Sequence, residues 1–557
     1  MLVIRAQEMR DIDKRAIEDY KIPGIVLMEN AALAVLGFME KTFKIDKNDS
    51  ILISAGTGNN GGDGYALARL LVDRGYRASL FIIGDREPKG DAGLNLRILE
   101  RLVEDQEDMG DGLSQDLGQD FSGTEKLLME KTLGTRLDIK RLRGPGDLKG
   151  LELALASSSI VVDAILGTGL DRPVEGLFAS AIDIINNSGR RILSVDIPSG
   201  IHGDSGRVMG TAIKASATVT FAYLKRGQVL YPAREHVGSL YLAPISIPSK
   251  IARDIGADKV FTLDKKEAAR LLKDRPRAGH KGSFGKLAIL AGSTGLTGAA
   301  YLTSIGALRS GAGLVTLGIP ASLNPIMEAK LTEVMTLPLE DRGLGHITRD
   351  SLPDIMRLLE GKDSVAIGPG LGKDKDILEI LRNIFGKINI SIVIDADGLN
   401  HISADIDLVA KHQAPVIMTP HPGEMARLMD MDIKELLSDP IQSAQALAKR
   451  TGAIVLLKGA ATVIADPSGR VYINRSGNEG MAKGGSGDLL TGIVAALLAQ
   501  AYDPFDAAVL ACFVHGLAGD LAAKEKGRLG MTPDDMALMI ARAFKDLYEM
   551  REKAHKL

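Results

Sequence analysis

The chain has 557 residues, of which 45% are hydrophobic and 25% are charged. Because one hydrophobic core stops growing at roughly 250 to 300 residues, this length predicts at least two domains. A formal net charge of -3 gives no electrostatic reason to expect a nucleic acid or a membrane as partner, so the composition favours small-molecule ligands.

Two features bear on the cellular compartment. Cys512 is the only cysteine, so the chain can form neither an intrachain disulfide nor a thiolate metal cluster, as is typical of proteins in a reducing cytosol. The N-terminal sequence carries acidic side chains too early for a secretory signal or a transit peptide. We also predict that no stretch is apolar enough to span a bilayer, and we therefore expect a cytoplasmic protein.

In the first half, short apolar runs alternate with helical patterns. The runs are residues 51–56 (ILISAG), 79–84 (SLFIIG), 160–167 (IVVDAILG), 191–200 (RILSVDIPSG) and 217–224 (ATVTFAYL). Runs of this length predict buried parallel strands, and the helical pattern from Gly64 indicates βα repeats. We predict an α/β domain over residues 1–248, a Rossmann-like three-layer α/β/α arrangement with its site at the carboxyl ends of the strands.

Two segments interrupt the strand pattern. From about Glu100 to Leu148 the chain is polar and weakly periodic, so we expect a surface excursion there. Residues 249–277 show no strand pattern and predict a junction with one or two short helices. A second series of apolar runs follows at residues 285–292, 314–320, 364–372, 391–400, 414–424 and 453–466. This series predicts a second α/β domain over residues 278–557.

A glycine-rich turn, TGNNGGDGYALARLL, follows the first predicted strand. Backbone N–H groups in such a turn can approach an anion. Its glycines could serve backbone geometry alone, but Asn59, Asn60 and Asp63 add side-chain oxygens that a plain turn does not need. Asp163 and Asp196 end two other predicted strands and should face the same edge. Each could be a satisfied buried acid or a helix cap, but a carboxylate in an apolar strand is costly unless paired or metal-bound.

Through NNGGDG, DAILGTGLDRP and SVDIPSGIHGDSG, the segment from Ile4 to Pro248 resembles the NAD(P)H-hydrate epimerases. The resemblance implies that the hydrated dinucleotide is contacted by Asn59, Asn60, Gly61, Gly62, Asp63, Gly167, Thr168, Gly169, Leu170, Asp171, Arg172, Pro173 and Asp196. It also implies a potassium ion held by Asn60, Asp163 and Ser199. In the reaction the ring nitrogen helps to expel a ring hydroxyl and water returns on the other face, and either Asp163 or Asp196 could shuttle the proton.

The sharpest motif of the second half is NEGMAKGGSGDLLTGIVAALLAQ, in which a glycine cluster and an aspartate precede an apolar helix. Backbone N–H groups of Gly484 to Gly487 would form an anion hole for a transferring phosphoryl group, and Asp488 would accept a proton from a hydroxyl. The alternative is that Asp488 only caps the helix. The motif is not a Walker loop, because the chain has no GxxxxGK[ST] string.

GGSGD resembles the signature of the ribokinase-like superfamily, and HKGSFGKLAILAGS, GPGLG, DADGLN and TPHPGEMARL make residues 278–543 resemble its NAD(P)H-hydrate dehydratases. The resemblance implies a ribokinase-like α/β domain with Asp488 as a catalytic residue. It implies that ADP is bound by Lys458, Gly459, Ala460, Ala461 and Thr462 and by the Ser476 to Gly487 loop, with Asn478, Glu479, Gly480, Met481, Ala482, Lys483, Gly484, Gly485, Ser486 and Gly487. It implies that the hydrated substrate is contacted by Ala299, Gly370, His421, Pro422, Gly423, Glu424, Met425, Ala426, Arg427 and Asp488.

Three details of this second site stay open. Glu424 could help to position magnesium with ADP, or it could merely cap the helix that follows. The HPGE setting of His421 favours a role in the site over that of an ordinary loop histidine. Lys483 stands where we expect threonine or another small residue, and it could contact the phosphates or point to solvent. The GMAKGGSGD context favours ADP over ATP.

The two resemblances together predict a bifunctional enzyme that repairs hydrated NADH and NADPH. The first domain would interconvert the R and S forms, and the second would dehydrate the S form by phosphorylating its hydroxyl with ADP, which gives AMP and phosphate. One alternative is a small-molecule kinase, for example of a vitamin precursor, with an accessory first domain. Another is a first domain that only binds or scaffolds. The family resemblance also suggests a homo-oligomer.

Overall fold

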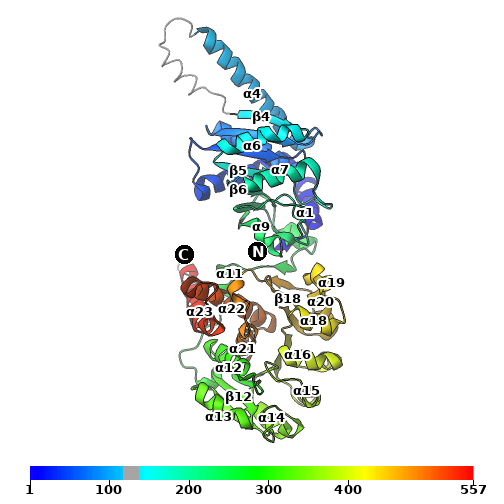
Figure 1. Ribbon diagram of the computed structural model, residues 1–557, viewed down its shortest axis with the longest axis vertical. Coiled ribbons are helices and arrows are strands. Elements are labelled where there is room, and N and C mark those ends of the chain that lie inside the picture. Colours follow the sequence, from blue (N-terminus) through cyan, green and yellow to red (C-terminus); the bar gives the residue numbers. More distant parts are fainter. Residues whose placement is uncertain (117–136, 556–557) are drawn as a thin grey trace. The chain divides into compact units, whose positions relative to one another are not determined.

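The computed structural model describes residues 1–116 and 137–555. Contacts divide the chain into two compact units, Leu2–Asp258 and Lys259–Leu557, with Met1 assigned to the second. Each unit contains one large β-sheet accompanied by helices (Figure 1). The prediction of two α/β domains is therefore confirmed.

The N-terminal unit is built on a seven-stranded sheet in the order β4-β3-β2-β5-β6-β7-β9, in which all neighbours are parallel. The strands are β2 (Ser50–Ala55), β3 (Arg77–Ile83), β4 (Leu137–Leu142), β5 (Ile160–Ala164), β6 (Arg191–Val195), β7 (Ala217–Phe221) and β9 (Ser239–Ala243). The strand order reverses between β2 and β5, and ligands of open parallel sheets bind beyond the carboxyl ends at such a point.

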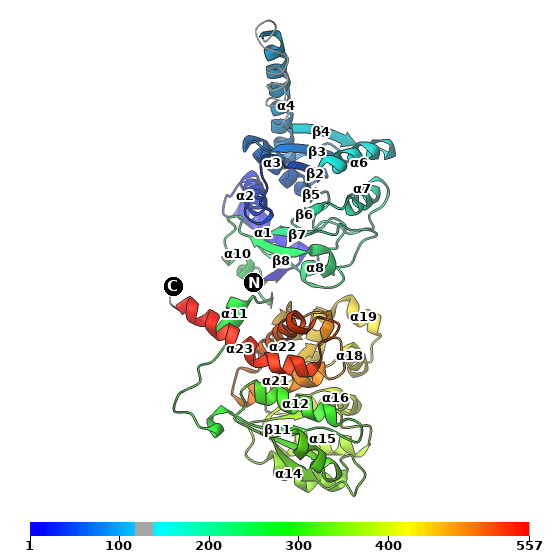
Figure 2. The same cartoon turned by 60° about the vertical axis from the view of Figure 1, so that its left-hand side comes forward.

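Helices cover both faces of this sheet, as Figure 2 shows. One face carries α1 (Ala6–Glu18), α2 (Gly24–Phe38), α3 (Asn59–Asp73) and α4 (Gly90–Asp116), and the other carries α6 (Leu148–Ser157) and α7 (Gly176–Asn187). Ile53 belongs to the core on the first face and Leu52 to the core on the second, because successive residues of a strand point to opposite faces. The three-layer arrangement is confirmed.

The sequence analysis missed the two edge strands and a small parallel pair, β1 (Val3–Ile4) with β8 (Leu224–Lys225). In β4 and β9 exposed and buried residues alternate, so these strands lack the continuous apolar run of a central parallel strand. The segment predicted as a surface excursion from about Glu100 to Leu148 contains regular structure at both ends, since α4 continues to Asp116 and β4 lies in the same segment. Residues 117–136 of that excursion lie outside the described residues.

The C-terminal unit contains a ten-stranded sheet in the order β10-β19-β18-β17-β16-β15-β14-β11-β12-β13. The strands are β10 (Val260–Phe261), β11 (Lys286–Leu290), β12 (Leu314–Pro320), β13 (Met335–Leu339), β14 (Ser364–Ile367), β15 (Ser391–Ile394), β16 (Val416–Met418), β17 (Ile454–Leu457), β18 (Val463–Ala465) and β19 (Val471–Ile473). β18 runs antiparallel to β17 and to β19, whereas the other pairs are parallel. The run at residues 453–466 is thus two strands joined by a turn.

One large apolar core joins this sheet to α12 (Thr297–Arg309), α21 (Ser486–Ala499), α22 (Pro504–Lys526) and α23 (Pro533–His555). The other helices of the unit are α11 (Lys265–Arg270), α13 (Asn324–Lys330), α14 (Leu352–Leu359), α15 (Asp376–Lys387), α16 (Ala396–Ile402), α17 (Asp407–Lys411), α18 (Pro422–Met429), α19 (Ile433–Ser438) and α20 (Pro440–Thr451). Every residue of α21 from Leu489 to Ala499 is buried, so this helix holds a fixed position against the sheet.

The segment predicted as a junction is shared between the two units. Helix α10 (Lys250–Asp254) belongs to the N-terminal unit, while β10 and α11 belong to the C-terminal unit. The boundary between the units lies after Asp258. The sequence analysis did not predict β10, since a strand of two residues leaves no periodic signal.

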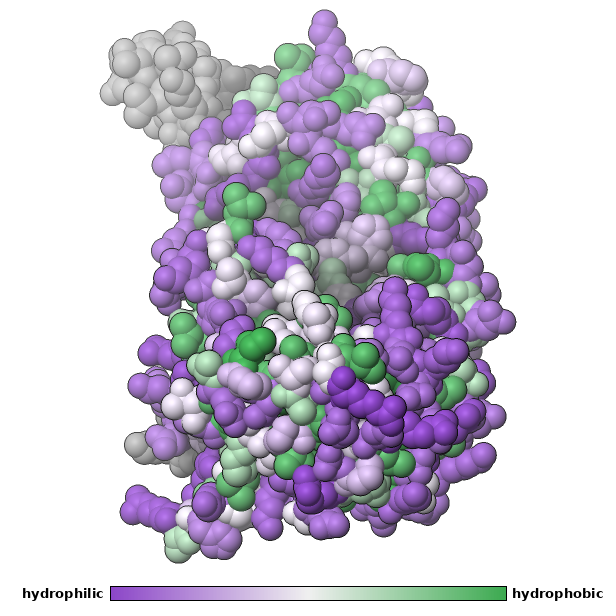
Figure 3. Space-filling model, turned by 60° about the horizontal axis from the view of Figure 1, so that its bottom comes forward, coloured by the Kyte–Doolittle hydropathy of each residue, from purple (hydrophilic) through white to green (hydrophobic). Residues whose placement is uncertain are grey.

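Among the described residues, α22 alone is long and apolar enough to cross a membrane by length and composition, so our expectation of no such stretch is corrected. Its most apolar window is 83% buried inside the structure. A core helix of this kind passes the same test because interior helices are apolar all round. On the face drawn in Figure 3, hydrophobic residues are scattered among hydrophilic ones.

Candidate active sites

A cavity of about 520 Å³ lies beyond the carboxyl ends of the central strands in the N-terminal unit. Of the predicted dinucleotide contacts, its lining includes Asn59, Asn60, Asp63, Gly167, Thr168, Gly169 and Asp196. The other predicted contacts are not part of the lining: Gly61 and Gly62 are buried in the first turn of α3, and Leu170, Asp171, Arg172 and Pro173 continue the loop after Gly169. The structure therefore gathers most, but not all, of the predicted set around one cavity.

The glycine-rich turn brings its polar side chains to this cavity. A Cβ atom on Gly61 would lie 1.8 Å from the carbonyl oxygen of Gly56, so only glycine lets the turn close. Asn60 Nδ2 donates to Leu166 O at 3.1 Å, while its buried Oδ1 has no hydrogen-bond partner among the residues that the structure describes. Such an orphaned acceptor is uncommon in a protein interior and indicates a ligand or an ion.

Asp163 ends β5, is fully buried, and is not part of the cavity lining. Its carboxylate accepts hydrogen bonds from Ser199 Oγ (2.5 Å), Ser199 N (2.9 Å) and Ser194 Oγ (2.8 Å). Burial raises the pKa of Asp163, and the hydrogen bonds from Ser199 and Ser194 oppose that shift. Leu166 N donates to Ser199 Oγ at 2.8 Å, so the Leu166 backbone connects the predicted potassium ligands Asn60, Asp163 and Ser199.

Asp196 follows β6 in the left-handed conformation, with φ at 61°, which is uncommon for a residue other than glycine. Its carboxylate lines the cavity and forms an ion pair with Lys225, whose side chain is only 1% exposed. Lys225 Nζ also donates to Thr220 Oγ1 at 2.8 Å and to Phe221 O at 3.2 Å. The three donors of this ammonium group are thus engaged, and the ion pair is a fixed part of the cavity wall.

Asp13 and Lys225 are two of the lining residues that were not predicted from the sequence. Burial raises the pKa of Asp13 to about 6, with Lys225 opposing and Asp196 adding to the shift. Burial also raises the pKa of Asp63, and the negative charges of Asp196 and Asp13 add to it. Lys225 was detectable as a lysine directly after an apolar strand run, whereas Asp13 lies in an amphipathic helix far from the glycine motifs.

In the C-terminal unit, the glycine cluster directly precedes α21. Gly485 is the N-cap, in the left-handed conformation with φ at 95°, and the helix begins at Ser486. Asp488 is therefore the third residue of the helix, and the interpretation of Asp488 as the cap is wrong. Burial raises the pKa of Asp488 to about 6, with Asp395 adding to the shift and Lys458 opposing it. A carboxylate with this pKa suits a general base near neutral pH.

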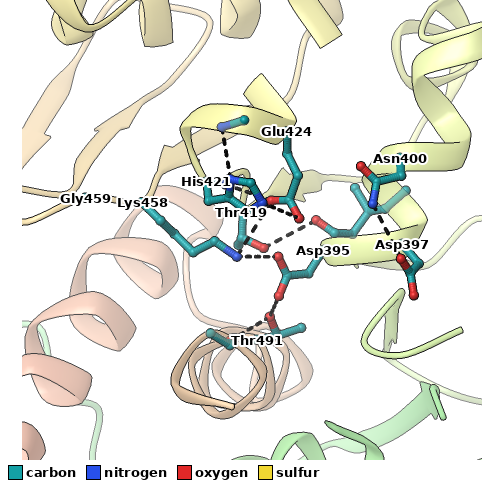
Figure 4. Close-up of polar contacts among 12 residues, drawn as sticks. Asp395, Asp397, Asn400, Thr419, His421, Glu424, Lys458, Gly459 and Thr491 are labelled. Carbon is teal, nitrogen blue, oxygen red and sulfur yellow. Dashed lines mark hydrogen bonds and ion pairs between the residues drawn. The ribbon is translucent and has the colours of Figure 1, made fainter. Parts of the chain in front are cut away.

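A buried charge cluster lies beside this helix start (Figure 4). Lys458 Nζ donates to Asp395 Oδ1 at 2.7 Å, and Thr491 Oγ1 donates to Asp395 Oδ2 at 2.6 Å. Glu424, at 5% exposure, lies 4.0 Å from Lys458 Nζ. Burial alone would lower the pKa of Lys458, but Asp395 and Glu424 outweigh it and raise that pKa. A Cβ atom on Gly487 would lie 3.3 Å from Lys458 Nζ, so this charge lies against the glycine turn.

The HPGE segment forms the first turn of α18. Glu424 Oε2 accepts a hydrogen bond from His421 N at 2.8 Å, and His421 Nδ1 accepts one from Gly423 N at 3.0 Å. Glu424 thus caps α18 and at the same time faces Lys458, so its two predicted roles are compatible. Burial lowers the pKa of His421, and Lys458 and Arg427 lower it further. Pro422, Met425 and Ala426 complete the predicted substrate segment within this helix.

A second polar chain connects the substrate segment with α16. Arg427 donates to Asn400 Oδ1 at 2.7 Å, and Asp397 Oδ2 accepts from Gly372 N at 2.9 Å. Asp395 and Asp397 belong to the DADGLN motif, but their contacts were not predicted from the sequence. The predicted contacts Ala299 and Gly370 are neighbours, since a Cβ on Gly370 would lie 3.2 Å from the Cβ of Ala299.

Helix α22 holds the predicted nucleotide loop. Ser476 Oγ donates to Phe513 O at 3.0 Å, and Asp520 accepts hydrogen bonds from Gly477 N at 3.1 Å and from Asn478 Nδ2 at 3.0 Å. The rest of the predicted ADP set continues this loop through Glu479, Gly480, Met481, Ala482 and Gly484, and forms the turn between β17 and β18 through Gly459, Ala460, Ala461 and Thr462.

Lys483 is exposed, and its side chain also contacts the protein. Its ammonium group donates to the carbonyls of Leu529, at 2.8 Å, and of Met531. It therefore ties the glycine loop to the segment between α22 and α23. Ser486 Oγ lies 3.3 Å from Nε2 of His515, whose pKa burial lowers to about 4, so this imidazole stays neutral at physiological pH.

Two α/β units, one with an acid-lined cavity and one with a glycine turn beside a buried carboxylate, define the class as a two-domain α/β enzyme. Residues 24–227 match the family described as YjeF-related protein N-terminus, and residues 287–542 match the NAD(P)H-hydrate dehydratase family. The bifunctional NAD(P)H-hydrate repair enzyme Nnr of Moorella thermoacetica is 39% identical over 99% of this chain and 98% of its own length. The enzyme of the same name from Thermofilum pendens is 35% identical over 99% of this chain and 97% of its own length.

The chain therefore belongs to the family of bifunctional NAD(P)H-hydrate repair enzymes, with an epimerase domain followed by a dehydratase domain. The predicted family and enzyme class are confirmed, and the small-molecule kinase alternative is not favoured. Among solved structures, this chain is similar to an ADP/ATP-dependent NAD(P)H-hydrate dehydratase from Bacillus subtilis that was co-crystallised with ATP and Mg²⁺. The sequence identity is 29%, the match covers 51% of this chain and 97% of the Bacillus chain, and the TM-score is 0.45.

Proposed function

We propose that the N-terminal domain interconverts the R and S forms of hydrated NADH and NADPH, and that the C-terminal domain dehydrates the S form with ADP. The observation that carries this proposal is the presence, in one chain, of an acid-lined cavity and of a glycine turn followed by Asp488. An epimerase would convert the form that a stereospecific dehydratase rejects, so the fusion lets one protein repair both.

In the dehydratase reaction, Asp488 takes the proton of the ring hydroxyl. The hydroxyl oxygen attacks the terminal phosphorus of ADP, the bond to the bridging oxygen breaks, and AMP leaves. Backbone N–H groups at the start of α21 stabilise the transferred charge. The new phosphate ester then departs as the ring nitrogen donates its lone pair, and loss of a proton from the neighbouring ring carbon restores the dihydronicotinamide.

Magnesium fits this site as a companion of the nucleotide. In the part of the chain that the structure describes, no group of three or more His, Cys, Asp or Glu side chains is arranged to hold a metal by itself. Mg²⁺ commonly binds through one or two carboxylates together with substrate phosphates, and Glu424 and Asp395 offer carboxylates beside Lys458. The ion would neutralise phosphate charge. We propose ADP as the nucleotide because of the GMAKGGSGD context.

Potassium is proposed at the loop that joins Asn60, Asp163 and Ser199. The orphaned Oδ1 of Asn60 fits a cation that prefers hard oxygen ligands. Asp163, which is buried without a cationic partner among the described residues, supplies a negative charge. A bound potassium ion would fix the loops on both sides of the cavity and contribute positive charge beside the substrate.

We also propose a cytoplasmic location and a homo-oligomeric assembly. The single, buried Cys512 suits a reducing compartment. The assembly follows from the family resemblance.

The first test adds the protein and magnesium to a mixture of both NADH-hydrate forms, with ADP, with ATP or without nucleotide. The recovery of absorbance at 340 nm is measured in each case. Complete recovery with ADP, together with AMP formation, is expected. Recovery that stops at the fraction of one form would contradict the epimerase. A stable phosphorylated product without recovered absorbance would support a kinase instead.

A further inference from the structure

The carboxyl groups in and beside the cavity of the N-terminal unit differ in whether other groups of the protein bind them. Asp163, one candidate for the proton shuttle, is fully buried, is not part of the cavity lining, and directs its oxygens at Ser194 and Ser199. Asp196, the other candidate, lines the cavity but is held by Lys225 and by Thr220 Oγ1 at 3.0 Å. Both carboxylates are therefore already bound by other groups of the protein.

Two other carboxyl groups face the same cavity without such partners. Asp13, from α1, and Asp63, from near the start of α3, both line it. Among the described residues neither side chain forms a hydrogen bond or an ion pair, although both lie in the field of Asp196 and Lys225. A partly buried carboxyl group without a hydrogen-bond or ion-pair partner is available to donate or accept a proton.

On the basis of the proposed epimerase function, we propose that Asp13 and Asp63 form the acid and base pair that moves the proton during epimerisation. They reach the cavity from two different helices, so they can act on the two faces of the ring. The N-terminal family match begins at residue 24 and leaves α1 outside it, so the contribution of Asp13 emerges only from the fold.

The proposed step breaks the carbon–oxygen bond on one face of the ring and forms a new one on the opposite face. One group, as the carboxylic acid, donates its proton to the ring hydroxyl, the carbon–oxygen bond breaks, and water leaves while the nitrogen lone pair forms a carbon–nitrogen double bond. Water then adds to that carbon from the opposite face and gives a proton to the other group, a carboxylate. The reverse reaction uses the pair in opposite roles, and exchange with solvent resets it.

The electrostatics of the cavity favour the protonated form of both carboxyl groups. Its charged lining groups are Arg10, Asp13, Asp63, Asp91, Asp196 and Lys225. Lys225 is committed to Asp196, and burial raises the pKa of both free carboxyl groups, that of Asp13 to about 6. Carboxyl groups whose pKa is raised in this way keep their protons at a higher pH than free carboxyl groups do.

The test uses the full chain without any nucleotide, so that dehydration cannot consume the substrate. Purified S form is supplied at saturating concentration, and liquid chromatography follows the appearance of the R form. D13N and D63N are compared with the wild type and with D11N, an exposed change on the same helix whose carboxylate only contacts Gln7. Thermal unfolding of each variant checks that the N-terminal domain is folded.

We expect D13N and D63N to lower kcat by about 100-fold or more, the range of general acid–base catalysis, with KM little changed and D11N like the wild type. The wild-type rate should fall on both sides of a maximum, and the limb with a midpoint near pH 6 should vanish in D13N. Rates for folded D13N within threefold of the wild type would overturn the inference while leaving the epimerase intact. No epimerisation by the wild type would overturn the proposed function as well.

Discussion

Lys458 Nζ lies 2.7 Å from Asp395 Oδ1, and the Asp395 side chain is only 1% exposed. The pair joins the end of β15 to the end of β17, two strands that are separated in the sheet by β16. It lies next to the glycine turn, so the same ammonium group stabilises the fold and places a positive charge where phosphates would bind.

Replacement of Lys458 by methionine should leave Asp395 buried without its counter-charge. Breaking such a pair costs about 3 to 5 kcal/mol, so K458M should unfold the C-terminal domain at lower denaturant concentration and abolish ADP-dependent recovery at 340 nm. K449M, at an exposed position of α20, is the matched control. A K458M domain as stable as K449M would contradict the structural role of the pair.

Asp488 should act only as a carboxylate. Because its pKa is raised to about 6, the dehydratase rate should increase with pH through about 6 and fall when the group is protonated below that value. D488N should lower the rate by roughly 100-fold or more and leave epimerisation unchanged. D407N, on an exposed side chain, is the control, and a pH profile of D488N with the same limb near 6 would exclude this assignment.

Gly516 on α22 should be needed for the nucleotide loop. A Cβ atom there would lie 2.2 Å from Ser476 Oγ and 2.6 Å from Ser476 C, so G516A should displace the loop, raise KM for ADP and destabilise the domain by about 1 to 3 kcal/mol. In G386A the added Cβ meets no atom within 4 Å and a helical glycine is removed, which should be neutral or stabilising. Equal ADP kinetics in both variants would disprove the role of the close contact.

Potassium should act through Asn60. N60A removes the orphaned Oδ1, so epimerisation by this variant should be slow and insensitive to potassium, whereas the wild type should slow when choline replaces potassium. Chromatography of the R and S forms over a series of potassium concentrations measures this. The dehydratase of the same chain serves as an internal control, since it should retain its activity in N60A.

The central strands and the two glycine turns could be predicted because their signals are local. The runs at 51–56 and 160–167 are continuous apolar segments, and the GGSGD string precedes a long apolar helix. The edge strands β4 and β9 could not be predicted in this way, because exposed residues alternate with partly buried ones and no continuous apolar run remains. Lys483 shows the same limit, since its carbonyl partners follow it by more than 40 residues.

By itself, the sequence determined two α/β domains and the place of each glycine turn, since periodicity and motif order are properties of neighbouring residues. Only the tertiary structure decided which carboxyl groups are available. Asp163 is buried and accepts hydrogen bonds from two serines, and Asp196 forms an ion pair with Lys225. Asp13 from α1 lines the cavity together with residues from segments much later in the chain. Burial and charge pairing depend on residues far apart in the chain, and they set the proton affinity of each acid.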